Sequence, residues 1–503
     1  MAEWNRRQFL LYGGLSLVTV GTAVLVSKGA FAFEESAETA KKLSPNPIPV
    51  NWDTLIWNGK IIDGTGAPLF LGALAIEGDK ISALFREKEG ARPGRLQGDN
   101  GQFSLAENEQ VLQVENYDSA ISDIREPLTF WADENTPFVL PEHCKIINAA
   151  GRCVTPGFID VHSHNEAYLR TNPEAELRLT QGITTQIGGN CGNSVPSITA
   201  FRKELGPLGL NYSQLVGYRN LRNQVIGDSA RKATTDEIDK MVALLEAELA
   251  DGAPGFSVAL EYHPQTAITT QELEVYARVV KDFDKILAVH LRSESDGLLE
   301  AFDEVLSVAR QTGVAVQYGH VKALFQANWS KHSLLMERFN SAIAEGIDLW
   351  GDVYAYDFSS WDFGTNRVSI SEANLIDTLQ QDRIFVGSDS GLYEGGRVNH
   401  PRACGNFPRI LARYVRDKEV LSLETAIAKM TSLPARRFRF HDRGTLAVGQ
   451  KADVLVFDPE QIQDRATRQQ PGLISTGIDY LFVNGIETIS ASLPTKALAG
   501  QWL

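Results

Sequence analysis

The 503-residue sequence has only four cysteines, and they stand at irregular spacing. A chain this long with so few cysteines is not built on a disulfide framework. It also lacks low-complexity tracts and repeats of solenoid period, which excludes disordered and solenoid architectures. Positive charge is scarce, with 48 lysines and arginines against 63 acidic residues and a net charge of −15. This balance argues against nucleic acid as a partner.

Residues 1–32 have the pattern of an export signal. Asn5-Arg6-Arg7-Gln8-Phe9-Leu10 precedes an apolar run that ends at Val26, and Ala30-Phe31-Ala32 offers small residues for cleavage. This order is typical of a twin-arginine signal peptide. It predicts the twin-arginine export machinery as a partner and a periplasmic or otherwise exported location. An uncleaved membrane anchor is the alternative, because an apolar run of about 17 residues is near the lower limit for spanning a bilayer.

Residues 33–52 are predicted to be an extended linker, because Pro45, Pro47 and Pro49 fall within them. Regular structure is therefore expected from about Trp52.

Both ends of the remaining chain are rich in short β segments. Thr54–Ile62 and Leu71–Ile81 alternate with turn residues, and Ala452–Asp458 and Tyr480–Gly485 have the same texture near the C-terminus. The two ends are predicted to form one small β-sandwich domain. It would comprise residues 53–155 and 437–503, with the polar, acidic residues 86–143 as an insertion.

Between these ends, apolar strands alternate with amphipathic helices, which are expected at Thr235–Glu248, Gln271–Val280 and Gly297–Arg310. This alternation is typical of a parallel sheet. Residues 156–436 have the length of one (β/α)₈ TIM barrel. The predicted fold class is therefore α/β, with a barrel and an accessory β domain.

One apolar segment, Val154 to His164, ends in two histidines. His162 and His164 are two residues apart, so on a strand both side chains leave the same face. Ligands and catalytic groups sit at the carboxyl ends of barrel strands. The pair therefore predicts a metal site.

Further polar residues follow other apolar strands in the same way, namely Cys191, His290, His320 and Asp389. Imidazole nitrogens and a thiolate are borderline-soft donors that suit zinc, whereas magnesium and calcium sites are mostly carboxylates and carbonyls. Zinc is therefore the expected cofactor.

This set of motifs resembles the amidohydrolase superfamily, and within it the N-acyl-D-amino-acid deacylases, or D-aminoacylases. The likeness runs from about Thr54 to the C-terminus. Gly188-Gly-Asn-Cys191-Gly matches the deacylase motif in which the cysteine takes the metal role. The segment Gly255–Glu261 contains no lysine, whereas hydantoinases and dihydroorotases use a carbamylated lysine on that strand.

The resemblance implies a tightly held zinc on Cys191, His290 and His320, and a second, weaker position on His162 and His164. Metal-bound hydroxide would attack the amide, because zinc lowers the pKa of its water to about 7.

Three further side chains are implied to hold the substrate carboxylate, namely Lys322, Tyr354 and Arg402. Asp389 is implied to be the general base, passing a proton to the leaving amine. The expected substrates are N-acyl-D-amino acids, cleaved to a carboxylate and a free D-amino acid. The sequence departs from the deacylases at Tyr218-Arg219, where they usually have a histidine.

Other functions remain open at this point. A close relative could cleave peptides that contain D-residues, or the chain could hydrolyse cyclic amides or dipeptides. The non-enzymatic alternative is a catalytically inactive protein that binds its ligand through a metal. A binding protein, however, has no use for a general base such as Asp389.

Overall fold

The structure is a computed structural model that describes residues 48–87, 101–105, 111–115, 129–133, 136–365 and 367–503. The predicted signal peptide lies outside these residues. Within the described ranges, no helix is both long and apolar enough to cross a bilayer.

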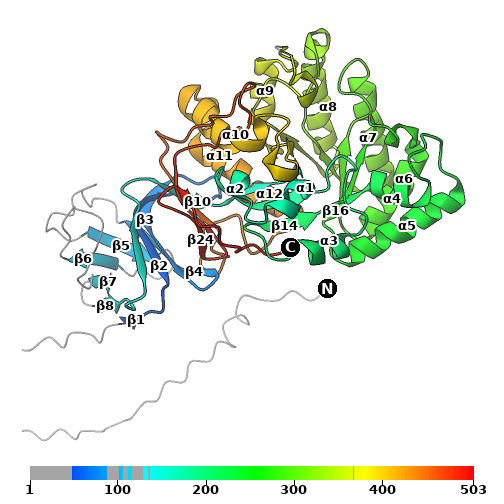
Figure 1. Ribbon diagram of the computed structural model, residues 1–503. Helices are drawn as coiled ribbons and strands as arrows, with labels where there is room; N and C mark the ends of the chain where they lie inside the picture. Colours follow the sequence, from blue (N-terminus) through cyan, green and yellow to red (C-terminus); the bar gives the residue numbers. More distant parts are fainter. Residues whose placement is uncertain (1–47, 88–100, 106–110, 116–128, 134–135, 366) are drawn as a thin grey trace, which may run out of the picture. The chain divides into compact units, whose positions relative to one another are not determined.

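Strands from both ends of the chain join one 14-stranded sheet, seen as neighbouring blue and red ribbons in Figure 1. The junction is β10, which pairs in parallel with β2 and antiparallel with β22. The strands of this sheet are β1 (Ile48–Pro49), β2 (Thr54–Ile61), β3 (Phe70–Glu77), β4 (Lys80–Glu87), β5 (Gly101–Leu105), β6 (Val111–Glu115), β7 (Thr129–Asp133), β8 (Thr136–Val139), β9 (Lys145–Asn148), β10 (Cys153–Pro156), β22 (Val454–Phe457), β23 (Ile478–Val483), β24 (Ile486–Ser490) and β25 (Leu493–Pro494).

The sheet buries side chains on both faces. Ile56 and Leu74 pack in one cluster with Val456 and Phe482 from the other end of the chain, whereas Trp57 belongs to a separate cluster on the opposite face. Successive residues of a strand point to opposite faces. Residues distant in the strand order share a cluster, so the sheet folds back on itself.

Regular structure begins earlier than predicted. The end of the expected linker is β1, which pairs in parallel with β8 at the edge of the sheet. The prolines suggested a linker, but proline is tolerated on an edge strand because its missing N–H faces no partner there. Within the expected insertion, β5–β8 extend the sheet beyond β4.

A second set of strands is parallel throughout: β11 (Phe158–Asp160), β12 (Ser163–His164), β13 (Ile183–Gly188), β14 (Asn211–Gln214), β15 (Val216–Gly217), β16 (Gly255–Ala259), β17 (Ile286–His290), β18 (Ala315–Tyr318), β19 (Leu349–Val353), β20 (Ile384–Val386) and β21 (Ser390–Gly391). Neighbours in the sheets follow the order of the chain from β11 to β20, with Leu215 alone between β14 and β15. The first and last segments also meet, because β12 pairs with β21.

The α-helices of the described residues are α1 (Glu166–Thr171), α2 (Glu176–Leu179), α3 (Ile198–Leu205), α4 (Tyr218–Val225), α5 (Thr235–Ala250), α6 (Thr270–Asp282), α7 (Leu298–Thr312), α8 (His332–Ala344), α9 (Glu372–Gln380), α10 (Arg402–Arg409), α11 (Leu423–Met430) and α12 (Ser432–Phe438). The predicted helices correspond to α5, α6 and α7, and each extends two residues beyond its expected end. A capping box formed by Thr234 and Glu237 starts α5.

The segment from Val154 to His164 is not one strand, contrary to the sequence prediction. It breaks at Gly157, where the chain passes from β10 in the composite sheet to β11 among the parallel strands. A Cβ atom at Gly157 would lie 2.2 Å from Cγ2 of Thr184. Only glycine allows the backbone to approach β13 so closely.

A buried ion pair ties α2 to the parallel strands. Arg178 contacts Asp160, and both side chains are fully buried. Asp160 also accepts a hydrogen bond of 2.9 Å from the backbone N–H of Ser388, and Arg178 donates to the carbonyl of Ala403 at 2.7 Å. The pair thus fixes the backbone next to Asp389.

We predict that Arg178→Met lowers the free energy of unfolding by roughly 3–5 kcal/mol, because it leaves the Asp160 carboxylate buried without its counter-ion. Urea denaturation measures the change. Arg278→Met is the control, since Arg278 forms an exposed pair with Glu274 at 3.5 Å and its loss should change stability by less than about 0.5 kcal/mol. Equal effects of the two substitutions would contradict the prediction.

Candidate active site and metal centre

Polar side chains at the carboxyl ends of the parallel strands meet at one place. Their donor atoms form four groups in each of which all atoms lie within 4.8 Å of one another; one consists of Glu261, His290 and Glu294, and the other three overlap at the centre of the site. These three groups are His162, His164 and Cys191; Cys191, His290 and His320; and His162, His320 and Asp389. The structure therefore brings together all six residues that the sequence analysis selected for metal binding and general base.

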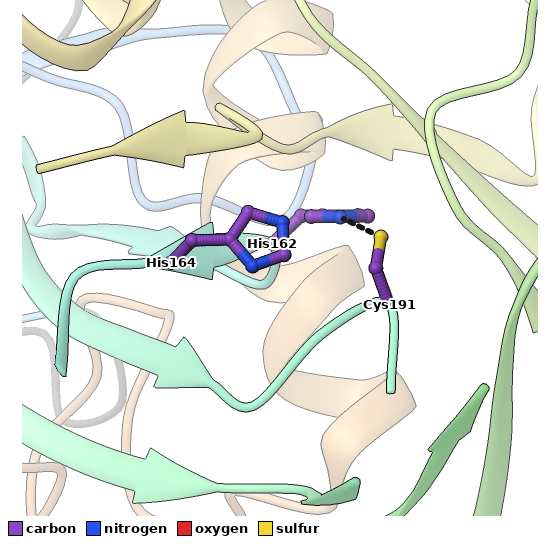
Figure 2. A group of neighbouring side chains, drawn as sticks. All are labelled: His162, His164 and Cys191. Atoms are coloured by element: carbon purple, nitrogen blue, oxygen red, sulfur yellow. Dashed lines mark hydrogen bonds between the residues drawn. The ribbon is translucent and has the colours of Figure 1, made fainter. Parts of the chain in front are cut away.

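Cys191 is the residue that the first two groups share. Figure 2 shows His164, from β12, and His162, which directly precedes β12, projecting towards it, and the dashed line marks the contact of 3.4 Å between Nε2 of His162 and the Cys191 sulfur. Nε2 of His320 lies 3.6 Å from the same sulfur. Thiolate and imidazole donors at this spacing fit a divalent metal of borderline softness.

The backbone conformation next to Cys191 requires glycine. Gly192 has a φ of 71°, and a Cβ atom there would lie 1.9 Å from Oε1 of Gln265. The Gln265 side chain donates to the carbonyl of Cys191 at 3.1 Å. The Gly-Asn-Cys-Gly motif thus forms a tight loop that projects the sulfur into the cluster.

The charge state of Cys191 follows from its surroundings. Burial raises the pKa of the thiol, but the charge of His162 and hydrogen bonds from His162, His164 and His290 outweigh burial and hold the pKa well below its usual value. A thiolate is the form that binds a metal.

Carboxylates outside the predicted set orient three of the histidine rings. Nδ1 of His162 lies 3.0 Å from Asp352, Nδ1 of His320 lies 2.8 Å from Glu294, and Nε2 of His290 lies 3.0 Å from Glu261. In each ring the other nitrogen faces the cluster. Such carboxylates fix the tautomer and the direction of a metal-binding histidine.

The sequence analysis missed these three carboxylates. Asp352 carried a usable signal, since it is a charged residue within the apolar segment Leu349–Val353, and its carboxylate also accepts from the backbone N–H of His320 at 2.8 Å. Glu261 and Glu294 lie in loops after β16 and β17, where spacing alone does not reveal their partners.

Asp389 connects the histidine cluster to Arg402. One carboxylate oxygen lies 3.3 Å from Nε2 of His164, and the other lies 2.7 Å from Nη2 of Arg402. Burial raises the pKa of this carboxyl, but Arg402, His320 and the neighbouring histidines outweigh it and hold the pKa well below its usual value. Asp389 is therefore a carboxylate at neutral pH.

Arg402 and Tyr354 leave polar atoms unused. The guanidinium lies 4.4 Å from the centroid of the Tyr354 ring. Nε and Nη1 of Arg402 and the hydroxyl of Tyr354 are buried and have no hydrogen-bond partner among the described residues. Buried donors of this kind suit an anionic ligand with several acceptor oxygens.

Lys322 is placed differently. Its Nζ lies 2.6 Å from Glu294 and 2.8 Å from Nδ1 of His320, so its ammonium is already neutralised. It lies 5.7 Å from the centroid of the Tyr354 ring.

The cluster opens into a pocket of about 580 Å³. Cys191, His320, Asp389 and Arg402 line it together with Arg219, which follows the altered position Tyr218. Tyr218 itself is buried and donates to Glu272 at 2.8 Å. Metal donors, a carboxylate and a guanidinium therefore face one space large enough for a small molecule.

Comparison with known proteins agrees with this arrangement. Residues 153–488 match the model of the amidohydrolase family. The chain belongs to that family. It is a hydrolase that acts on carbon–nitrogen amide bonds.

Several relatives of this amidohydrolase are deacylases. It is 34% identical over 421 residues, 69% of this chain and 86% of the relative, to N-acyl-D-glutamate deacylase of Alcaligenes xylosoxydans xylosoxydans. It is 30% identical over 430 residues, 71% of this chain and 88% of the relative, to D-aminoacylase of the same organism. A solved N-acyl-D-glutamate deacylase from Bordetella bronchiseptica, complexed with zinc and a phosphonate inhibitor, has a TM-score of 0.73 at 28% identity and covers 90% of this chain and 100% of its own.

We expect Cys191→Ala to weaken metal binding by at least about 100-fold, because the substitution removes a donor common to two groups. Elemental analysis after dialysis against a weak chelator measures retained metal. Cys404→Ala is the matched control, since Cys404 is also a buried free thiol but belongs to no donor group found among the described residues. Full retention of metal by the Cys191 variant would contradict the assignment.

Metal affinity should rise with pH up to about 9. Burial lowers the pKa of His164, but hydrogen bonds to Asp389 and Cys191 outweigh it and raise the pKa to about 9, and burial of His290 is likewise outweighed by Glu294 and Cys191, which raises its pKa to about 9. Below that pH protons compete with the metal for the imidazoles. Competition titrations with a chromophoric chelator between pH 6 and 9 test this, and an affinity independent of pH would refute it.

Proposed function

We propose that this amidohydrolase removes the acyl group from N-acyl-D-amino acids and releases a carboxylate and a free D-amino acid. The deacylase relatives support this substrate class. One observation carries the proposal: one carboxylate oxygen of Asp389 lies beside the metal donors, and the other oxygen pairs with Arg402. A general base and a carboxylate-binding group are thereby held next to each other in one pocket.

The proposed cofactor is zinc, with one ion held tightly by Cys191, His290 and His320 and a second, weaker position at His162 and His164. The chemistry of the donors and the zinc in the Bordetella deacylase support this choice. When bound, the metal supplies a Lewis acid that polarises the amide carbonyl and activates water.

Asp389 acts as the general base in this proposal. Its low pKa keeps a carboxylate oxygen free of protons at neutral pH, so Oδ1 can take a proton from the attacking water. The same oxygen then returns this proton to the leaving amine nitrogen. Arg402 holds the other oxygen and so keeps the carboxylate in position.

The substrate carboxylate is proposed to bind Arg402 and Tyr354. Their buried polar atoms have no partner among the described residues, and a substrate carboxylate would supply two acceptor oxygens. Lys322 pairs with Glu294 and so positions the carboxylate that contacts Nδ1 of His320.

The proposed architecture is a (β/α)₈ barrel over residues 156–436, with a β-sandwich domain from residues 53–155 and 437–503. Pairing of β12 with β21, and of β10 with β22, supports it. Residues 1–32 are proposed to direct twin-arginine export to the periplasm, with an uncleaved anchor as the alternative.

We expect Asp389→Asn to retain its metal but to lower kcat on N-acetyl-D-amino acids by roughly 10²- to 10⁴-fold, since it removes the proton acceptor. Asp377→Asn is the control, because Asp377 pairs with His332 at 2.9 Å and its side chain is half exposed. Metal content is measured on each sample. Unchanged turnover in the Asp389 variant would exclude its role as the base.

Arg402→Ala should lower kcat/KM for N-acetyl-D-amino acids about 10- to 100-fold more than for their uncharged carboxamides, because only the acids need a charge-assisted hydrogen bond. Comparing the two substrate series separates this loss from any general effect of the substitution on Asp389. An equal loss on both series, or turnover of cyclic amides in preference to N-acyl-D-amino acids, would overturn the proposed substrate class.

A further inference from the structure

A second pocket lies at the opposite ends of the parallel strands. It has a volume of about 430 Å³ and is lined by Ile286, the first residue of β17, and by Ala315, the first residue of β18. His290 ends β17 on the metal side. One strand length, roughly 13 Å at 3.3 Å per residue, therefore separates this pocket from the metal cluster.

Four arginines line this pocket, namely Arg383, Arg436, Arg437 and Arg439. Two of them have anionic partners. Arg437 lies 2.8 Å from Asp348, and Arg439 pairs with Asp284 through a hydrogen bond of 2.6 Å. Within a chain of net charge −15, this is a local concentration of positive charge.

The other two arginines have no ion-pair or hydrogen-bond partner for their guanidinium groups among the described residues. The Arg383 guanidinium lies 5.4 Å from the centroid of the Trp350 ring, and the Arg436 guanidinium lies 5.3 Å from it. Contact with one aromatic ring holds both groups beside the pocket. Their hydrogen-bond donors remain available to a ligand.

Arg437 is the one buried arginine among the four. Its side chain is only 4% exposed, and its Nε has no hydrogen-bond partner among the described residues. Burial, and then the nearby charges of Arg383 and Arg439, lower the pKa of Arg437 to about 10, although Asp348 opposes this. The like charges of Arg383 and Arg439 thus act on Arg437, and an added anion would offset them.

The rest of the lining comprises Asp348, whose carboxylate pairs with Arg437, and apolar side chains that include Ile286, Ile343 and Ile347. Guanidinium groups recognise planar or tetrahedral oxyanions with two or more acceptor oxygens. The space beside the apolar residues accommodates a short carbon chain.

We propose that this pocket binds a small organic dianion, with its anionic oxygens held by Arg383 and Arg436 and its carbon atoms against the isoleucines. The pocket would recognise two negative charges on oxygen atoms of the ligand. Either a phosphoryl group or a dicarboxylate supplies them. The site is independent of the proposed deacylase activity, since it shares no residue with the metal cluster or its pocket.

Isothermal titration of the metal-loaded protein with glycerol phosphate and, separately, with glutarate tests the proposal. The double variant Arg383→Gln/Arg436→Gln should weaken binding of the tighter probe at least tenfold. Arg278→Gln/Arg310→Gln is the matched control, because it removes two exposed arginines of α6 and α7 that pair with Glu274 and Glu345. It should bind like the unmodified protein.

The two probes distinguish the two sources of the dianion. If glycerol phosphate binds more tightly and the binding depends on Arg383 and Arg436, the ligand belongs to the phosphoryl class; if glutarate does, it belongs to the dicarboxylate class. Absence of saturable binding by both probes would overturn the proposal. So would equal binding by the two double variants, because an anion held at the metal centre would be retained by both. Thermal unfolding and metal content confirm that each variant is folded.

Discussion

Mutual compensation of buried charges is the constraint on which the rest of this site depends. Four imidazoles, a thiol and a carboxyl group lie within a few ångströms of one another at the ends of the parallel strands. Each group alone would lose its charge on burial, because removal from water disfavours the ionised form. Together they keep Cys191 and Asp389 ionised, as a metal requires, while the same negative charges raise the pKa of His164 and His290, so that protons compete with the metal there.

Carboxylates around the cluster continue this compensation of charge. Asp352, Glu294 and Glu261 each occupy one ring nitrogen of a histidine and leave the other directed into the cluster. Lys322 in turn neutralises Glu294. The direction of the donors is therefore set by contacts between different strands, and the Gly-Asn-Cys-Gly loop contributes the sulfur only because Gly192 allows Gln265 to approach.

Positive charge in this acidic protein gathers at the two ends of the parallel strands. At the metal end Arg402 pairs with Asp389 and has two buried donors without a hydrogen-bond partner among the described residues. At the other end Arg383 and Arg436 stand beside Trp350. The surroundings of the two arginines differ: Arg402 is buried and paired with the proposed base, whereas Arg436 is exposed and lies beside an aromatic ring.

Many helices, strands and site residues could be predicted from the amino-acid sequence, because the period of apolar residues marks helices and strands directly. The helices α5, α6 and α7 were found within two residues, and the donors His162, His164, Cys191, His290 and His320 stood out because each follows an apolar strand. Other features depended on contacts across the fold. The break at Gly157 comes from the approach of Thr184, and Glu261 and Glu294 find their histidines only when loops from different strands meet. Spacing along the chain encodes the direction of a side chain within its own element, whereas its partners from other elements are determined only when the strands assemble.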